Sequence, residues 1–167
     1  RHKSLERSVV READAVVSVT KQMTADFAKL LDPAITDGDK KLHTICNGYD
    51  EADFETSGHT VPGEKFTLTH TGLFSADGNP VNLWETLAQM CAEDPAFRTH
   101  LRLRLIGKVD AEVLEAIEAN GLTPNLENMG YRPHSEIPSY QQSGWALLLP
   151  LRNEPESKAI LTGKFFE

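Results

Sequence analysis

The sequence has few cysteines, no excess of positive charge and no long hydrophobic run, and each shortage excludes a class of protein. Two cysteines among 167 residues cannot build a disulfide framework, so we expect a reducing, cytoplasmic location. The net charge is −8, so general binding to the phosphate backbone of nucleic acids is not expected. No stretch of about 18 apolar residues occurs, so no membrane span is predicted. With 40% hydrophobic and 25% charged residues, the composition is that of an ordinary globular protein.

The common nucleotide, metal and nucleophile motifs are also missing. No Gly-x-Gly-x-x-Gly follows a predicted strand, and the sequence has no P-loop. The six histidines are scattered without Cys/His spacing that suits zinc, so we expect no metal site and no cofactor. No Gly-x-Ser-x-Gly nucleophile motif occurs, and no catalytic residue can be assigned.

Residues 65–167 alternate between short apolar strands and amphipathic helices. Strands are predicted over 66–70, 101–107 and 125–129, and the unbroken apolar run 145–151 is typical of a strand buried on both faces. One helix is predicted to begin with Asn79 as its N-cap and to bury Cys91, and a second to follow Asp110. This alternation predicts an α/β fold, a Rossmann-like, doubly wound parallel sheet.

The chain before this region has a different character. Residues 1–13 predict a charged helix and residues 15–19 a buried strand, whereas residues 47–64 are rich in turn dipeptides such as Asn47-Gly48 and Pro62-Gly63. We therefore predict the end of an N-terminal domain at 1–46, a hinge at 47–64 and a partial C-terminal domain at 65–167. Because the first residue is Arg and the last six residues indicate the opening of a helix, we expect a piece of a longer protein.

Two features point to the carboxyl edge of the predicted sheet, where open α/β folds bind ligands. Gly72, Gly107 and Gly130 each follow a strand; singly each indicates a turn, and together they favour close approach of backbone to a ligand. A helix opening at residues 162–163 can hold a diphosphate through its free N–H groups, with Lys164 adding charge. Glu167, one turn further, can accept two ribose hydroxyls. A surface helix with a Lys–Glu pair remains the simpler interpretation.

In this order, the segments resemble the retaining glycosyltransferases of family 4, which have two Rossmann-like domains of the GT-B type. Residues 45–54 (Ile-Cys-Asn-Gly-Tyr-Asp, then Phe) resemble the hinge of that family, and 66–72 and 103–107 resemble the first strands of its donor domain. Gly130-Tyr131-Arg132-Pro133-His134 resembles the loop beside the nucleotide base, and Gly163-Lys164-Phe165-Phe166-Glu167 resembles the start of a donor-site helix. The resemblance covers nearly the whole chain.

The resemblance implies a function. The parent enzyme would transfer a sugar from a nucleoside-diphosphate sugar to an acceptor hydroxyl, without metal and with retention, and this fragment alone would be inactive. The residues implied to bind the donor nucleotide are Glu167 at the ribose, Gly163, Lys164 and Gly72 near the phosphates, and Tyr131 and Arg132 at the base.

The resemblance also implies partners. A glycan or lipid-linked acceptor, as in polysaccharide biosynthesis, would bind the missing domain. The parent enzyme could therefore be peripherally attached to the inner face of the membrane. The exposed edge of an incomplete sheet favours a homodimer.

Some positions depart from the family pattern. Ala159 stands where the first Glu of a paired-Glu motif is expected, and Leu73 stands where Arg is common. Lys158, Lys164 or Arg152 could supply the missing charge. Two alternatives therefore stay open: a nucleotide-sugar epimerase of the same architecture, and a non-catalytic nucleotide-binding or scaffold module of flavodoxin-like form.

Overall fold

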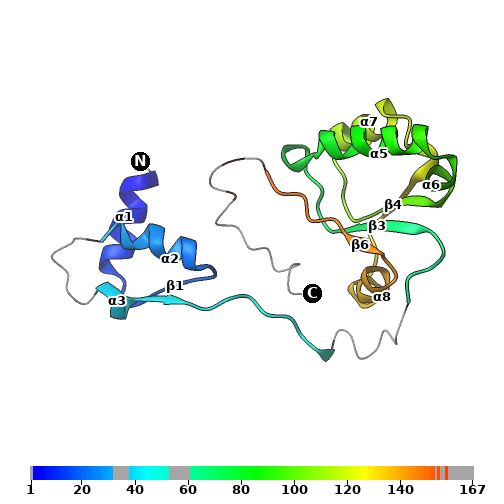
Figure 1. The fold of residues 1–167 in the computed structure, drawn as a ribbon. Helices are drawn as coiled ribbons and strands as arrows, with labels where there is room; N and C mark the ends of the chain where they lie inside the picture. Colours follow the sequence, from blue (N-terminus) through cyan, green and yellow to red (C-terminus); the bar gives the residue numbers. More distant parts are fainter. Residues whose placement is uncertain (1, 32–37, 53–60, 153, 155–156, 158–167) are drawn as a thin grey trace. The chain divides into compact units, whose positions relative to one another are not determined.

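A computed structural model of the chain describes residues 2–31, 38–52, 61–152, 154 and 157 (Figure 1). The chain divides into two compact units, a smaller one that includes the residues up to Tyr49 and a larger one from Asp50 to Asn153. This division lies inside the segment 47–64 for which the sequence predicts a hinge. The boundaries proposed for the domains themselves stay a prediction.

The smaller unit is built around two short parallel strands. Its elements are α1 (His2–Glu12), β1 (Val16–Ser18), α2 (Lys21–Ala28), α3 (Gly38–Lys41) and β2 (Leu42–Thr44), and β1 pairs with β2. Helix α2 begins after Thr20, whose hydroxyl accepts a hydrogen bond from the Met23 N–H at 3.1 Å. Such an N-cap satisfies a backbone donor that the helix itself leaves without a partner.

The strand expected at residues 15–19 is present as β1, but the expectation that it is buried is wrong for most of its length. Val17 is 56% exposed, and on α1 only Val10 is buried whereas Leu5 and Val9 are exposed. These apolar side chains line an open groove of about 660 Å³ between α1 and β1. The hydrophobic pattern correctly marks one face of helix α1, but of its three apolar side chains only Val10 is covered by described residues.

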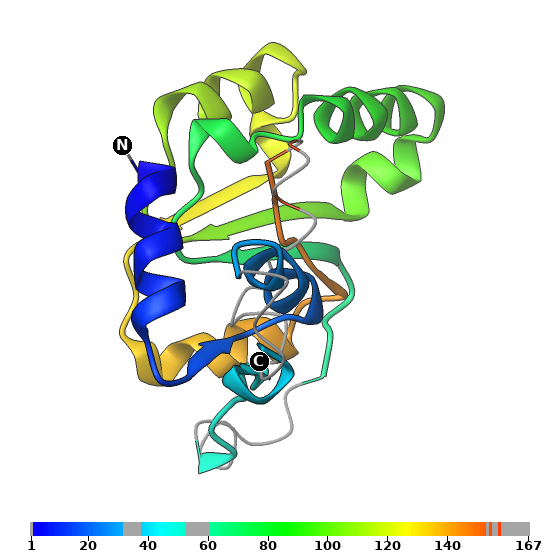
Figure 2. The same ribbon diagram turned by 90° about the vertical axis from the view of Figure 1, so that its left-hand side faces the viewer.

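The larger unit is a parallel sheet with helices on both faces. Its strands are β3 (Phe66–Thr71), β4 (Leu101–Ile106), β5 (Leu126–Gly130) and β6 (Ala146–Leu147), in the order β5-β4-β3-β6 and all parallel. Helices α5 (Val81–Glu93) and α7 (Ala111–Ala119) lie on one face and α8 (Ile137–Gln142) on the other (Figures 1 and 2). The remaining elements are α6 (Pro95–His100) and the 3-10 turns η1 (Ala76–Gly78), η2 (Thr123–Asn125) and η3 (His134–Glu136). The predicted doubly wound α/β fold is confirmed.

The two faces of this sheet have opposite chemistry because successive residues of a strand point to opposite sides. Leu101, Leu103 and Leu105 of β4 pack in one buried cluster with Trp84 of α5 and Ile117 of α7. The residues between the leucines, Arg102 and Arg104, belong to the face covered by α8, next to Thr67 and Thr69 of β3. The core of the unit therefore lies on the α5/α7 face.

Two local expectations are wrong. Asn79 is not the N-cap of α5, since Pro80 occupies that position; the side-chain oxygen Oδ1 of Asn79 instead accepts a hydrogen bond from the Trp84 indole N–H at 2.7 Å. The apolar run 145–151 is not a buried strand, because only Ala146–Leu147 pairs with β3 and both residues are exposed. Among the described strands, β6 is at the edge of the sheet, and an edge position leaves side chains uncovered.

Candidate functional site

The carboxyl edge of the sheet is organised by the three glycines singled out from the sequence. Gly72, Gly107 and Gly130 all have positive φ, at 100°, 114° and 62°. The Gly72 N–H donates to the Ile106 carbonyl at 2.7 Å, and the Gly107 N–H donates to the Gly130 carbonyl at 2.8 Å. A Cβ atom at Gly107 would collide with the Gly72 carbonyl group. Neighbouring strand ends thus approach one another so closely that position 107 accepts only glycine.

Hydrogen bonds join the turns that follow β3 and β4 at this edge. The Phe74 N–H donates to the Lys108 carbonyl at 2.9 Å, and the Asp110 N–H donates to the Phe74 carbonyl at 3.0 Å. The Asp110 carboxylate accepts a further hydrogen bond from the Ala76 N–H at 3.1 Å. The Phe74 side chain is fully buried, with its ring centroid 4.5 Å from that of His70. Backbone groups at the edge are therefore held in place before any ligand binds.

Of the residues implied to bind a donor nucleotide, half lie in the described part of the chain. Gly72 follows β3, and Tyr131 and Arg132 follow β5, so all three stand at the carboxyl edge. Tyr131 is 86% exposed and Arg132 is also exposed, which leaves both side chains accessible to a ligand. Gly163, Lys164 and Glu167 lie outside the described residues, as do Ala159 and Lys158. The binding roles of the six implied residues stay a prediction.

Of the cationic side chains at this edge, some form ion pairs and others do not. Arg152 forms an ion pair with Asp77 of η1, with Nη2 and Oδ2 separated by 2.6 Å. Its charge is therefore already opposed, which weakens it as a substitute for the missing Arg at position 73. Lys108 directly follows Gly107, is exposed, and has no ion pair within the described ranges. Lys108 was missed as a candidate, although its place after a strand-terminating glycine was a signal.

Leu73 is 61% exposed at the same edge. An exposed leucine offers no charge to a phosphate, so a cation at the end of β3 would have to come from another part of the chain. Lys108 follows β4, which is one of the two strands adjacent to β3.

The described residues contain no cluster of three or more His, Cys, Asp or Glu side chains that could hold a metal ion. Cys91 is buried on α5, as expected, and burial raises the pKa of its thiol, against a smaller opposing effect of the Arg98 charge. A thiol with a raised pKa is a poor nucleophile near neutral pH. Among the described helices, none combines the length and the hydrophobicity that a membrane span requires.

Comparison with known proteins gives similarity at the level of structure. No family model matches the sequence, and no curated protein matches it significantly. One similar solved structure is a mutant of S. aureus TarM in complex with fondaparinux, alpha-GlcNAc-glycerol and UDP, at 13% identity and a TM-score of 0.56 over 87% of this chain. Another is WaaG, a glycosyltransferase involved in lipopolysaccharide biosynthesis, at 12% identity and a TM-score of 0.56 over 92% of this chain.

This likeness agrees with the Rossmann-like fold of GT-B type predicted from the sequence. The chain spans 27% of the length of the TarM structure and 42% of that of WaaG. At such low identity the likeness concerns the fold, and residue roles do not follow from it.

Proposed function

We propose that this chain is part of a glycosyltransferase that transfers a sugar from a nucleoside-diphosphate sugar to a hydroxyl group of an acceptor. The observation that carries the proposal is the carboxyl edge of the parallel sheet, where the backbone at Gly72, Gly107 and Gly130 is partly exposed and held by hydrogen bonds between neighbouring strand ends. Ligands of open α/β sheets bind at this edge. A similar fold holds UDP in the TarM structure, which supports a nucleoside diphosphate as the ligand.

The chemistry of transfer is the stabilisation of a leaving diphosphate. As the sugar departs, negative charge develops on the diphosphate, and fixed cations and N–H groups lower the barrier most when they already face that charge. Lys108 is exposed and has no ion pair in the described part, so its charge is available to a phosphate group. Such cations take the role that a metal ion has in other transferases, so the proposal includes no metal and no cofactor.

The base and ribose would bind to either side of the phosphates. Tyr131 and Arg132 follow Gly130 in an exposed segment, and an exposed aromatic ring and a guanidinium group both suit stacking on a base. In this proposal Gly163 and Lys164 meet the phosphates at a helix start and Glu167 binds the ribose. Retention of configuration, family 4 membership and a glycan or lipid-linked acceptor are parts of the same proposal, and WaaG, a lipopolysaccharide enzyme, supports the acceptor class.

Turnover with labelled nucleotide sugars tests the proposal in a protein that contains this chain and a complete acceptor domain. Release of nucleoside diphosphate together with a glycosylated acceptor supports transfer. Lys108→Gln should lower kcat, whereas Arg98→Gln, which removes an equal charge from the exposed helix α6, should leave it unchanged. Changed sugar stereochemistry without transfer would indicate an epimerase instead. Nucleotide binding without turnover would indicate a scaffold, a reading that the exposed Leu73 favours.

A further inference from the structure

The larger unit has few Lys and Arg residues, and nearly half of them line the same groove. Between Asp50 and Asn153 the sequence has seven Lys and Arg against fifteen Asp and Glu, so this unit alone has a net charge of eight negative. Three of its seven cationic side chains, Lys65, Arg102 and Arg104, line a single groove.

The groove lies on the polar face of the sheet, away from the carboxyl edge. Its volume is about 430 Å³, and its lining comes from the approach to β3, the amino-terminal parts of β3 and β4, and the residue after α8. The lining residues are Val61, Gly63, Glu64, Lys65, Thr67, Arg102, Arg104 and Ser143. Since the proposed donor site is at the opposite ends of the same strands, the groove is a separate feature.

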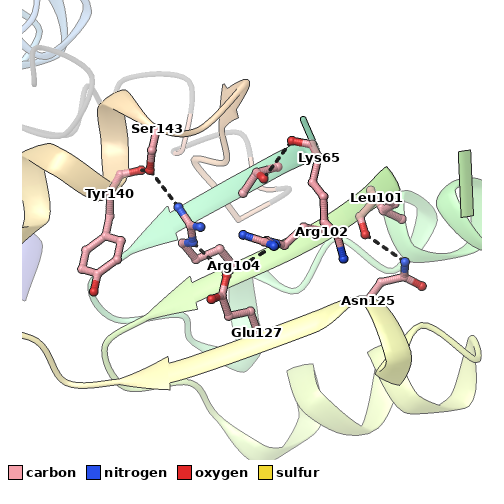
Figure 3. A network of polar contacts seen from close by, with 9 residues as sticks. Lys65, Leu101, Arg102, Arg104, Asn125, Glu127, Tyr140 and Ser143 are labelled. Carbon is pink, nitrogen blue, oxygen red and sulfur yellow. Dashed lines mark hydrogen bonds and ion pairs between the residues drawn. The ribbon is translucent and has the colours of Figure 1, made fainter. Parts of the chain in front are cut away.

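The floor of the groove is a guanidinium group held in a fixed orientation. Arg104 is only 8% exposed; its Nε donates to Glu127 Oε2 at 2.9 Å and its Nη1 donates to the Ser143 hydroxyl at 2.8 Å (Figure 3). The guanidinium carbon lies 5.5 Å from the centre of the Tyr140 ring. A charged side chain bound in this way loses little further freedom when it binds a ligand.

The other two cations are less well neutralised. Arg102 Nε lies 3.8 Å from Glu127 Oε2, the oxygen that already accepts the shorter bond from Arg104, so a single carboxylate serves two guanidinium groups. The Lys65 ammonium group has no ion pair with any residue that the structure describes. Figure 3 shows Lys65, Arg102 and Arg104 on the same face of the sheet. With Glu64 also counted, the groove keeps one excess positive charge.

The wall that includes Lys65 is tied to the sheet. The Trp145 indole N–H donates to the Gly63 carbonyl at 2.9 Å, and the Thr67 hydroxyl donates to the Lys65 carbonyl at 3.0 Å. The Phe66 and Trp145 rings also pack together, with centroids 6.4 Å apart. These contacts fix the backbone beside the groove, which gives the groove a defined shape.

We propose that this groove is a binding site for a phosphate group. Planar guanidinium groups match phosphate oxygens in geometry, and a lysine adds a point charge. A phosphate placed among the three cations would also relieve the repulsion between Lys65 and its arginine neighbours, which share one carboxylate. The volume admits a phosphate together with part of a molecule that carries it. The proposal does not depend on donor binding at the carboxyl edge.

Titration followed by amide NMR shifts tests this site, with inorganic phosphate, glucose 6-phosphate and acetate as separate ligands. We expect phosphate to shift the signals of Thr67, Arg102 and Ser143. Arg102→Gln and Lys65→Gln should each weaken phosphate binding roughly five- to tenfold, since each removes one charged contact. Neither residue is buried, so both variants should fold. Arg98→Gln removes the same charge from the exposed surface of α6 and should change the affinity less than about twofold.

Each outcome decides the question. Tighter binding of glucose 6-phosphate than of inorganic phosphate would identify a phosphate carried by a sugar, and the reverse order would identify the free ion. Equal affinity for acetate would overturn the choice of phosphate. The site itself would be refuted if the shifts appear only near Gly72 and Gly130, if phosphate binds nowhere, or if Arg98→Gln weakens binding as much as Arg102→Gln.

Discussion

The two faces of the sheet in the larger unit share the same strands and serve different purposes. On the α5/α7 face, leucines of β4 pack against Trp84 and Ile117, so burial of apolar surface stabilises the fold. On the α8 face, hydroxyls and guanidinium groups of β3 and β4 form a polar layer around Arg104. The apolar face thus contains the hydrophobic core of the unit, whereas the face covered by α8 is held by polar contacts and includes the groove proposed to bind phosphate.

The largest effect is expected on the apolar face. Trp84→Ala should lower the free energy of unfolding by about 3–5 kcal/mol, because it removes a fully buried aromatic side chain and leaves a cavity. Urea unfolding followed by circular dichroism measures the change. A loss below about 1 kcal/mol would mean that this face does not stabilise the unit as described.

Removal of the Arg104 charge should have a smaller effect on stability. Arg104→Met keeps the aliphatic length but breaks the bonds to Glu127 and Ser143, and we expect a loss of about 1–2 kcal/mol. The Glu127 side chain is 38% exposed, so water can solvate the carboxylate that remains. The same urea experiment on the double variant Arg104→Met, Glu127→Gln provides the control. The second substitution should add little, and full additivity would contradict the described pair.

Two threonines of β3 permit a closely matched test of the polar face. The Thr69 hydroxyl is buried and has no hydrogen-bond partner among the described residues, whereas the Thr67 hydroxyl donates to the Lys65 carbonyl. Thr69→Val should therefore be neutral or stabilising by up to about 1 kcal/mol, and Thr67→Val should destabilise by about 1 kcal/mol. Thermal unfolding of both variants measures the contrast. Equal destabilisation by the two substitutions would show that the polar layer is described incorrectly.

The smallest predicted effect concerns chemical reactivity. Cys91 packs with the apolar cluster and burial raises the pKa of its thiol, so little thiolate is present near neutral pH; Cys46 is exposed. A thiol reagent should modify Cys46 rapidly and Cys91 only after unfolding. Mass spectrometry of the modified protein distinguishes the two sites. Rapid modification of both cysteines would indicate that the α5 side of the core opens readily.

Local patterns in the sequence were sufficient to predict most of the sheet. Strands β3, β4 and β5 were predicted because each combines apolar residues with a terminal glycine, and Gly72, Gly107 and Gly130 have the positive φ that explains their identity. Strand β6 was misjudged because hydrophobic residues at a sheet edge look the same in sequence as those at its centre. Helix α6 was missed although Asp94-Pro95 is a clear start signal, with the Asp94 carboxylate accepting from the Ala96 N–H.

The polar contacts could not be predicted, because they join residues far apart in the chain. In sequence, Arg102 and Arg104 look like the solvated face of an alternating strand, and nothing nearby indicates that Ser143 and Glu127 would bind Arg104. Asn79-Pro80 is a local signal for a helix start. The hydrogen bond that Asn79 instead forms with Trp84 could not be predicted, because it depends on the position of α5. The donor residues Gly163, Lys164 and Glu167 lie outside the described residues, so their part of the candidate site is still a prediction.

The most direct test of the proposed function is an amide NMR titration of this chain with uridine and guanosine diphosphates. If the carboxyl edge is the donor site, one of the two nucleotides should shift the signals of Gly72, Gly107 and Tyr131, and Lys108→Gln should weaken the binding. If neither nucleotide shifts these signals, or if the shifts occur only on the helices α5 and α7, a sugar nucleotide does not bind at this edge and the proposed function is wrong.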